Sequence, residues 1–227
     1  MAIDQRKRQR KLERKAAKRR EAVRKRSVAQ GYIASLPRRL QIEAAAECPI
    51  HHCLVGADIF RRGMGTVVFS RRLANGRIAA AFFLVDTFCL GVKDAFLVFM
   101  PKSEFEIKTL EMDRTAAWSS KTPAFARKLV EDAVAYASAL GLSPHPDYDV
   151  SKTLFGNTDV SECREVFVFG QNGKPHFIAG PNDSPAKCQR IMDTLHDRVG
   201  PDGFHYTVPV DPDDLDEFDF LGEDDES

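Results

Sequence analysis

The chain has 227 residues, 43% of them apolar, and its 33 basic residues balance its 33 acidic ones. This composition allows one packed domain or two small ones. It excludes a membrane-spanning helix, because the longest apolar stretch, residues 78–85, is far shorter than the ~20 residues that such a helix needs. The N-terminus leads into no apolar signal segment, and the five cysteines lack the spacing of a disulfide framework. We therefore expect a soluble cytoplasmic protein with reduced thiols and no membrane partner.

The neutral total conceals a basic N-terminal arm, which we place at residues 1–30. Residues 1–27 contain thirteen basic residues against three acidic ones, a local balance of +10. Their composition favours a helix, but Leu12 and Val23 are too sparse to form a core-facing stripe. Cationic segments of this density bind polyanions by releasing their counterions. The predicted nucleic-acid contacts are Arg6, Lys7, Arg8, Arg10, Lys11, Arg14, Lys15, Lys18, Arg19, Arg20, Arg24, Lys25 and Arg26.

A short helix and a strand are predicted after the arm. Residues 38–47 follow Pro37 and place several apolar side chains near one face, and Pro49 ends this segment. Residues 50–55 then predict a short strand.

The segment Cys48-Pro-Ile-His51-His52-Cys53 is the most metal-like cluster of the chain. A structural zinc site has four ligands, usually in two separated pairs, and the second pair is missing here. In a regular strand, His51 and Cys53 would share one face and His52 would lie on the other. Cys48, His51 and Cys53 are thus candidate ligands only, and we expect neither a metal nor another cofactor.

The middle of the chain predicts an antiparallel hairpin and further strands. Residues 65–72 and 77–85 flank Asn75-Gly76, and Asn-Gly between two apolar runs is a strong hairpin signal. Residues 95–100 predict another buried strand, and residues 105–110 predict a weaker one.

Between two of these strands lies the densest polar insertion within apolar sequence, residues 86–94. One interpretation is a turn with an internal ion pair, because buried charges need partners. The other is a catalytic cleft, in which Asp86 or Asp94 is an acid, base or metal ligand and Cys89 is a nucleophile near Lys93. The sequence favours the turn and keeps the four residues as catalytic candidates.

One helix has clear start and stop signals, and a second, shorter helix has a stop signal. Thr122 followed by Pro123 predicts a helix that ends at Gly141. Residues 147–155 predict a shorter helix that stops at Gly156.

The second half repeats the hairpin signal. Residues 165–170 and 175–180 flank Asn172-Gly173, so we predict a second hairpin there. Ser184-Pro185 then predicts a helix that runs to about Val199.

Residues 204–210 predict a last strand, and an acidic tail follows at residues 211–227. The tail contains ten acidic residues and no basic one, a composition typical of disorder. One hypothesis is that the tail folds back on the arm and competes with an external polyanion. An alternative is that Phe218, Phe220 and Leu221 make it a short peptide ligand for the groove of a partner.

The sequence thus predicts an α+β fold, mostly an antiparallel sheet with two Asn-Gly hairpins and packed helices. We divide the chain into a basic helical arm (1–30), a globular domain (31–210) and a disordered acidic tail (211–227). The favoured function is binding of RNA, DNA or a ribonucleoprotein through the arm. The alternatives are a cleft enzyme, such as a hydrolase, that uses Asp86, Cys89, Lys93 and Asp94, and a protein-interaction module. The sequence predicts no oligomeric state.

Overall fold

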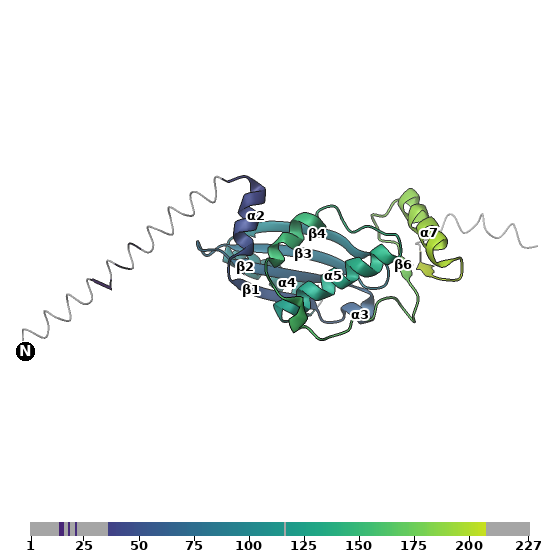
Figure 1. Ribbon diagram of the computed structural model, residues 1–227, viewed down its shortest axis with the longest axis horizontal. Helices are drawn as coiled ribbons and strands as arrows, with labels where there is room; N and C mark the ends of the chain where they lie inside the picture. Colours follow the sequence, from purple (N-terminus) through teal and green to yellow (C-terminus); the bar gives the residue numbers. More distant parts are fainter. Residues whose placement is uncertain (1–13, 16–17, 19–20, 22–35, 116, 208–227) are drawn as a thin grey trace, which may run out of the picture.

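Strands followed by helices give this chain an α+β fold, as the sequence predicts (Figure 1). The computed structural model describes residues 14–15, 18, 21, 36–115 and 117–207. In chain order its elements are α2 (Arg38–Ala46), β1 (Ile50–Gly56), α3 (Ile59–Arg62), β2 (Met64–Arg72), β3 (Ile78–Asp86), β4 (Gly91–Met100), α4 (Lys102–Thr115), β5 (Trp118–Ser120), α5 (Pro123–Ala139), α6 (Tyr148–Ser151), the 3₁₀ turns η1 (Lys152–Phe155) and η2 (Val160–Glu162), β6 (His176–Ile178), α7 (Pro185–Val199) and β7 (His205–Thr207).

Five strands form one antiparallel sheet in the order β4-β3-β2-β1-β5. The central strands β2 and β3 pair along their whole length. The predicted Asn75-Gly76 turn joins them. There, the Asn75 side chain accepts a hydrogen bond from the Arg77 N–H (2.9 Å), and Gly76 adopts a φ of +82°, which glycine tolerates without strain. The first predicted hairpin is confirmed.

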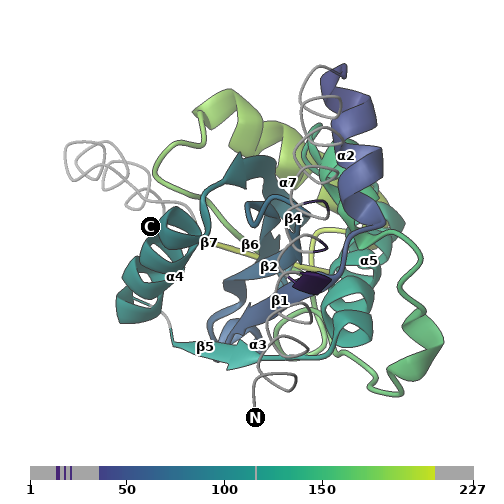
Figure 2. The same cartoon turned by 90° about the vertical axis from the view of Figure 1, so that its left-hand side faces the viewer.

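Helices α4 and α5 cover opposite faces of this sheet (Figure 2). Successive strand residues point to opposite faces, so Phe83 packs in the same core as Leu129 of α5, and its neighbour Phe82 packs with Phe105 of α4. A strand that is buried on both faces is apolar at nearly every position. This requirement explains why β3 is a continuous apolar run rather than an alternating one.

The predicted helix starts are confirmed by their hydrogen bonds. At the start of α5, the Thr122 hydroxyl accepts from the Phe125 N–H. At the start of α7, the Ser184 hydroxyl accepts from the Lys187 N–H in the same way. The shorter helix expected at residues 147–155 forms as one α-helical turn, α6, followed by the 3₁₀ turn η1.

The strand predicted at residues 105–110 is wrong, because this segment lies inside the helix α4. Phe105 packs against the sheet, and Met112, seven residues later, packs on the same apolar cluster. Two helical turns separate these residues, so one helix face covers the sheet. Trp118 holds the end of this arrangement by donating from its indole N–H to the Thr109 carbonyl (2.8 Å).

The second predicted hairpin is wrong in its strands and right in its turn. Gln171 and Lys174 form a single antiparallel bridge around Asn172-Gly173, and both turn residues have positive φ. No further strand pairing follows this bridge, because the segments before and after the turn each pack or pair elsewhere. Phe167 and other residues before the turn pack on the main core, and β6 after it pairs in parallel with β7.

The predicted alternation in β1 is also wrong, because the register shifts between Ile50 and Cys53. The rings of His51 and His52 both lie near Phe105, at centroid distances of 5.5 and 6.3 Å, and Cys53 packs in the opposite core. A bulge of this kind leaves backbone groups without ladder partners. Here Ser70 supplies them: its buried hydroxyl accepts from the His52 N–H (3.0 Å) and donates to the His52 carbonyl (2.9 Å).

A smaller unit follows the sheet. β6, β7 and α7 lie at the end of the molecule opposite α2 (Figure 1). Its apolar cluster joins Phe177 and Leu195 to Cys89 and Leu90 of the β3–β4 turn. Residues 208–210 of the last predicted strand, and the tail at 211–227, lie outside the described residues.

Candidate functional site

The structure describes only four residues of the basic arm. Arg14, Lys15, Lys18 and Glu21 are helical, and their side chains are exposed. The other ten predicted nucleic-acid contacts lie outside the described residues, and the arm's function stays a prediction.

Asp86 closes the turn between β3 and β4. Its side chain is almost fully buried, and its Oδ1 accepts hydrogen bonds from the N–H groups of Phe88 (2.8 Å) and Cys89 (2.9 Å). Burial raises the pKa of the Asp86 carboxyl, and the backbone hydrogen bonds oppose that rise. Because Oδ1 of Asp86 already accepts hydrogen bonds from the backbone of its own turn, the geometry favours a structural role for this carboxylate.

Cys89 is fully buried in the cluster that joins the turn to α7. Burial raises the pKa of its thiol, and the nearby Asp86 carboxylate raises it further. A nucleophilic cysteine needs the opposite, a lowered pKa and access to solvent. The geometry therefore favours a packing role for Cys89 over a catalytic one.

Lys93 and Asp94 lie on β4 and point to different partners. The Lys93 Nζ lies 2.7 Å from Oδ2 of Asp183, in the loop before α7. The Asp94 carboxylate is half exposed and lies 3.6 Å from Nε2 of His145. The four catalytic candidates thus divide into a buried pair, Asp86 and Cys89, and two β4 residues, Lys93 and Asp94, whose charges face partners from other segments.

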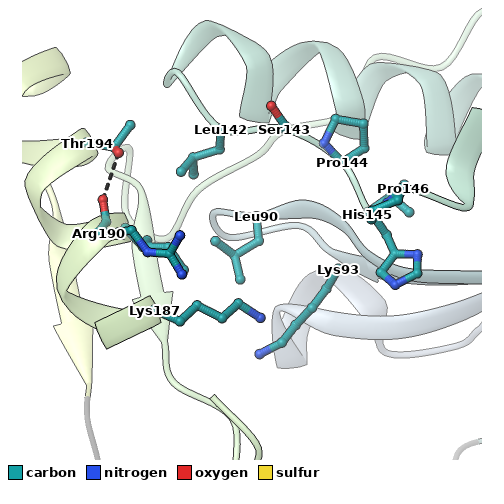
Figure 3. A pocket seen from close by; sticks show the side chains of 12 residues that line it. Leu90, Lys93, Leu142, Ser143, Pro144, His145, Pro146, Lys187, Arg190 and Thr194 are labelled. Atoms are coloured by element: carbon teal, nitrogen blue, oxygen red, sulfur yellow. Dashed lines mark hydrogen bonds between the residues drawn. The ribbon is translucent and has the colours of Figure 1, made fainter. Parts of the chain in front are cut away.

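Lys93 and His145 border a pocket of about 360 Å³ between β4, the segment after α5, and α7 (Figure 3). Its lining combines apolar side chains, mainly of leucine, isoleucine and proline, with basic side chains. The lining residues are Leu90, Val92, Lys93, Leu142, Ser143, Pro144, His145, Pro146, Lys187, Arg190, Ile191 and Thr194.

Asp183 holds two of these basic side chains in place. Its Oδ2 accepts from the Lys93 Nζ (2.7 Å), and its Oδ1 accepts from the Lys187 Nζ (2.7 Å). Oδ2 also accepts from the Gly180 N–H (2.7 Å). Burial alone would raise the pKa of the Asp183 carboxyl. The hydrogen bonds from the two lysines and from Gly180, together with the charge of Lys93, outweigh burial and hold this pKa well below its usual range. A Cβ at Gly180 would lie 2.9 Å from the Lys93 Nζ, so glycine gives this ammonium room.

The metal-like cluster near β1 does not assemble into a site. Within the described part of the chain, no group of three His, Cys, Asp or Glu side chains lies close enough to hold a metal ion. The Cys48 thiol donates to the Ala44 carbonyl (3.6 Å), and the Cys53 thiol lies in the core, where burial raises its pKa to about 12. His51 packs on the other side of the sheet. All five cysteines are free thiols.

Sequence reasoning missed Asp183, Lys187 and Arg190. The sequence predicts a helix from Ser184-Pro185 to about Val199 and assigns none of its residues to a site. One local signal was available: Lys187 and Arg190 are three residues apart, so a helix places both cations on one face. Their proximity to Lys93, some ninety residues earlier, depends on the tertiary fold.

Comparisons with known protein families, curated proteins and solved structures find no match to this chain. Among the helices formed by the described residues, none has the length and apolar character to cross a membrane. The function must therefore be argued from the residues themselves.

Proposed function

We propose that this protein binds RNA, DNA or a ribonucleoprotein through its basic arm, residues 1–30, and that the α+β domain provides a second contact. The observation that supports the proposal is the local balance of +10 in residues 1–27, set beside a neutral total. Displacement of condensed counterions favours binding of such a segment to a phosphate backbone, without a folded pocket. A cytoplasmic location belongs to the same proposal.

Two features of the described residues support it. The side chains of Arg14, Lys15 and Lys18 are exposed, which supports contact between these basic side chains and a ligand. The catalytic alternative loses support, since the structure buries Asp86 and Cys89 among backbone and apolar partners. Arginine and lysine contacts to phosphate fix position and carry no sequence information, so we expect little sequence preference.

Removal of the arm tests the proposal. Full-length protein and a variant that lacks residues 1–27 are titrated into labelled mixed-sequence RNA and duplex DNA in dilute buffer. We expect the deletion to weaken binding at least tenfold, because most phosphate contacts are lost. Unfolding curves of both proteins control for the integrity of the domain. If the full-length protein binds neither RNA, nor DNA, nor ribosomes in dilute buffer, the proposal is wrong.

A further inference from the structure

The pocket between β4 and α7 has the charge and the shape of an anion site. Its twelve lining residues include three permanent cations, Lys93, Lys187 and Arg190, together with His145, and no carboxylate (Figure 3). Its volume of about 360 Å³ falls within the range of small-molecule sites. We propose that this pocket binds an organic phosphate monoester, either a free small molecule or the terminal phosphate of a nucleic-acid chain.

The lysine pair is fixed in advance by Asp183. The Lys93 and Asp183 side chains are only 14% and 5% exposed, so this ion pair is largely desolvated and held in place. Asp183 accepts one hydrogen bond from each lysine. Because an ammonium has three N–H groups, two donors remain on each lysine for a ligand. The lysine side chains are therefore already ordered before a ligand binds, and this preorganisation lowers the entropic cost of binding.

Arg190 adds a planar donor group. Its Nε donates to the Ala186 carbonyl (3.3 Å), and within the described residues its Nη groups have no hydrogen-bond partner, so they are available to an acceptor. A guanidinium matches the oxygen spacing of a phosphate and binds it in a bidentate manner. In Figure 3 the Arg190 and Lys187 side chains extend from α7 toward the space beside Leu90.

Charge balance selects a phosphate monoester over a carboxylate. Among the ion pairs of the described residues, Asp183 is the only carboxylate that contacts Lys93, Lys187 or Arg190, so this group of four side chains has a net charge of +2. A phosphate monoester carries about −1.5 to −2 near neutral pH, and a carboxylate carries only −1. The monoester therefore neutralises the site more completely.

The apolar part of the lining selects an organic ligand. Leu90, Leu142, Pro144 and Ile191 contribute apolar surface to the pocket, and inorganic phosphate has no apolar group to cover it. A sugar, base or ring attached to the phosphate would cover it and add hydrophobic binding energy. This inference does not rest on nucleic-acid binding by the arm, because its residues belong to the β3–β4 turn, β4, the 142–146 segment, the loop before α7, and α7 itself.

Calorimetric titration of the full chain tests the inference. The ligands are phenyl phosphate, ribose 5-phosphate and adenosine monophosphate, with phenol, ribose and adenosine as their dephosphorylated counterparts. We expect at least one phosphate to bind and its counterpart not to bind. Lys187→Gln and Arg190→Gln should each weaken binding roughly tenfold, because each removes a charge-assisted hydrogen bond.

Lys152→Gln is the matched control. Lys152 is 45% exposed and pairs with Asp149, three residues earlier, and Lys187 is 46% exposed and pairs with Asp183, four residues earlier. The control should bind as the wild type does. The inference is overturned if none of the three phosphates binds at millimolar concentration, or if Lys152→Gln weakens binding as much as Lys187→Gln. Unfolding curves of the three variants confirm that each is folded.

A pair of short RNA oligonucleotides distinguishes the two sources of the phosphate. One has a 5′-phosphate and the other a 5′-hydroxyl, and both are measured at a salt concentration high enough to suppress the arm's contribution. A preference for the 5′-phosphate that Arg190→Gln abolishes identifies a chain end as the ligand. Equal binding of the two, with retained binding of a free phosphate, identifies a small molecule.

Discussion

The Asp86 carboxylate closes the β3–β4 turn by accepting the N–H groups of Phe88 and Cys89. We predict that Asp86→Ala lowers the free energy of unfolding by about 2 kcal/mol, because two buried donors lose their acceptor. Asp86→Asn keeps an acceptor oxygen at the same place and should retain most of the stability. Urea unfolding of the three proteins measures both effects. Equal losses in the two variants would contradict a turn-closing role.

His51 gives the fold a dependence on pH near neutrality. Its Nε2 is buried and has no hydrogen-bond partner among the described residues. Burial lowers the pKa of His51, and the charges of His52, Lys102 and Arg72 lower it further, while Glu106 opposes them. The unfolded chain therefore takes up this proton near pH 6.5, and the folded chain takes it up only at lower pH. The stability that His51 contributes is complete above the pKa of the unfolded chain, near 6.5. It is lost as the pH falls from there through the lowered pKa of the folded chain.

We therefore predict that the wild type loses more free energy of unfolding between pH 7 and pH 5 than His51→Phe does. Phenylalanine keeps an aromatic ring against Phe105 and removes the titrating group. Urea unfolding at a series of pH values measures the difference. His176, whose pKa is also lowered by burial, contributes equally to both proteins. Parallel pH profiles for the two proteins would show that His51 does not titrate as described.

At the scale of elements, Gly91 fixes how closely β4 approaches α5. It has a φ of +64°, and a Cβ there would lie 2.6 Å from the Ala133 carbonyl oxygen. We predict that Gly91→Ala destabilises the protein by about 2–4 kcal/mol, through strain and overpacking together. Gly76→Ala is the matched control. Gly76 has a similar positive φ and nothing within 4 Å of the added Cβ, so only the conformational cost of about 1 kcal/mol applies. Thermal unfolding of both variants compares them, and equal losses would contradict the close approach.

Local sequence signals predicted the elements whose structure depends on local chemistry. Thr122 and Ser184 start helices through their own hydroxyls, and Asn75-Gly76 and Asn172-Gly173 turn the chain wherever they occur. The predictions failed where tertiary contacts decide. The 105–110 segment has apolar residues that fit either a strand or a helix, and only its packing on the sheet selects the helix α4.

The candidate sites also divide into features that local sequence predicts and features that depend on tertiary contacts. The sequence singled out Asp86, Cys89, Lys93 and Asp94 because they interrupt an apolar run, and the structure separates them by burial. It could not predict the pocket, because Lys93 meets Asp183 across ninety residues of chain. Contacts at such separation leave no periodic pattern in one sequence.

For the whole molecule, the proposed function joins a +10 arm and a −10 tail to a neutral domain. If the tail competes with nucleic acid for the arm, deletion of residues 211–227 should tighten binding of RNA at low salt and change it little at high salt, since salt screens both interactions. Fluorescence anisotropy with the full-length and shortened proteins measures this. Unchanged affinity at low salt would rule out the competition.

The salt dependence of nucleic-acid affinity tests the central proposal most directly. If the full chain contacts about five phosphates of duplex DNA, the logarithm of its binding constant should fall against the logarithm of salt concentration with a slope of roughly −4 to −5. Replacement of Arg14, Lys15 and Lys18 by glutamine should make that slope shallower by about 2.7, if each side chain contacts one phosphate. A control variant neutralises Arg61, Lys102 and Lys152, exposed basic side chains of the domain that pair with carboxylates. The control should keep the wild-type slope, and an equal change in the two variants, or no salt dependence at all, would contradict binding through the arm.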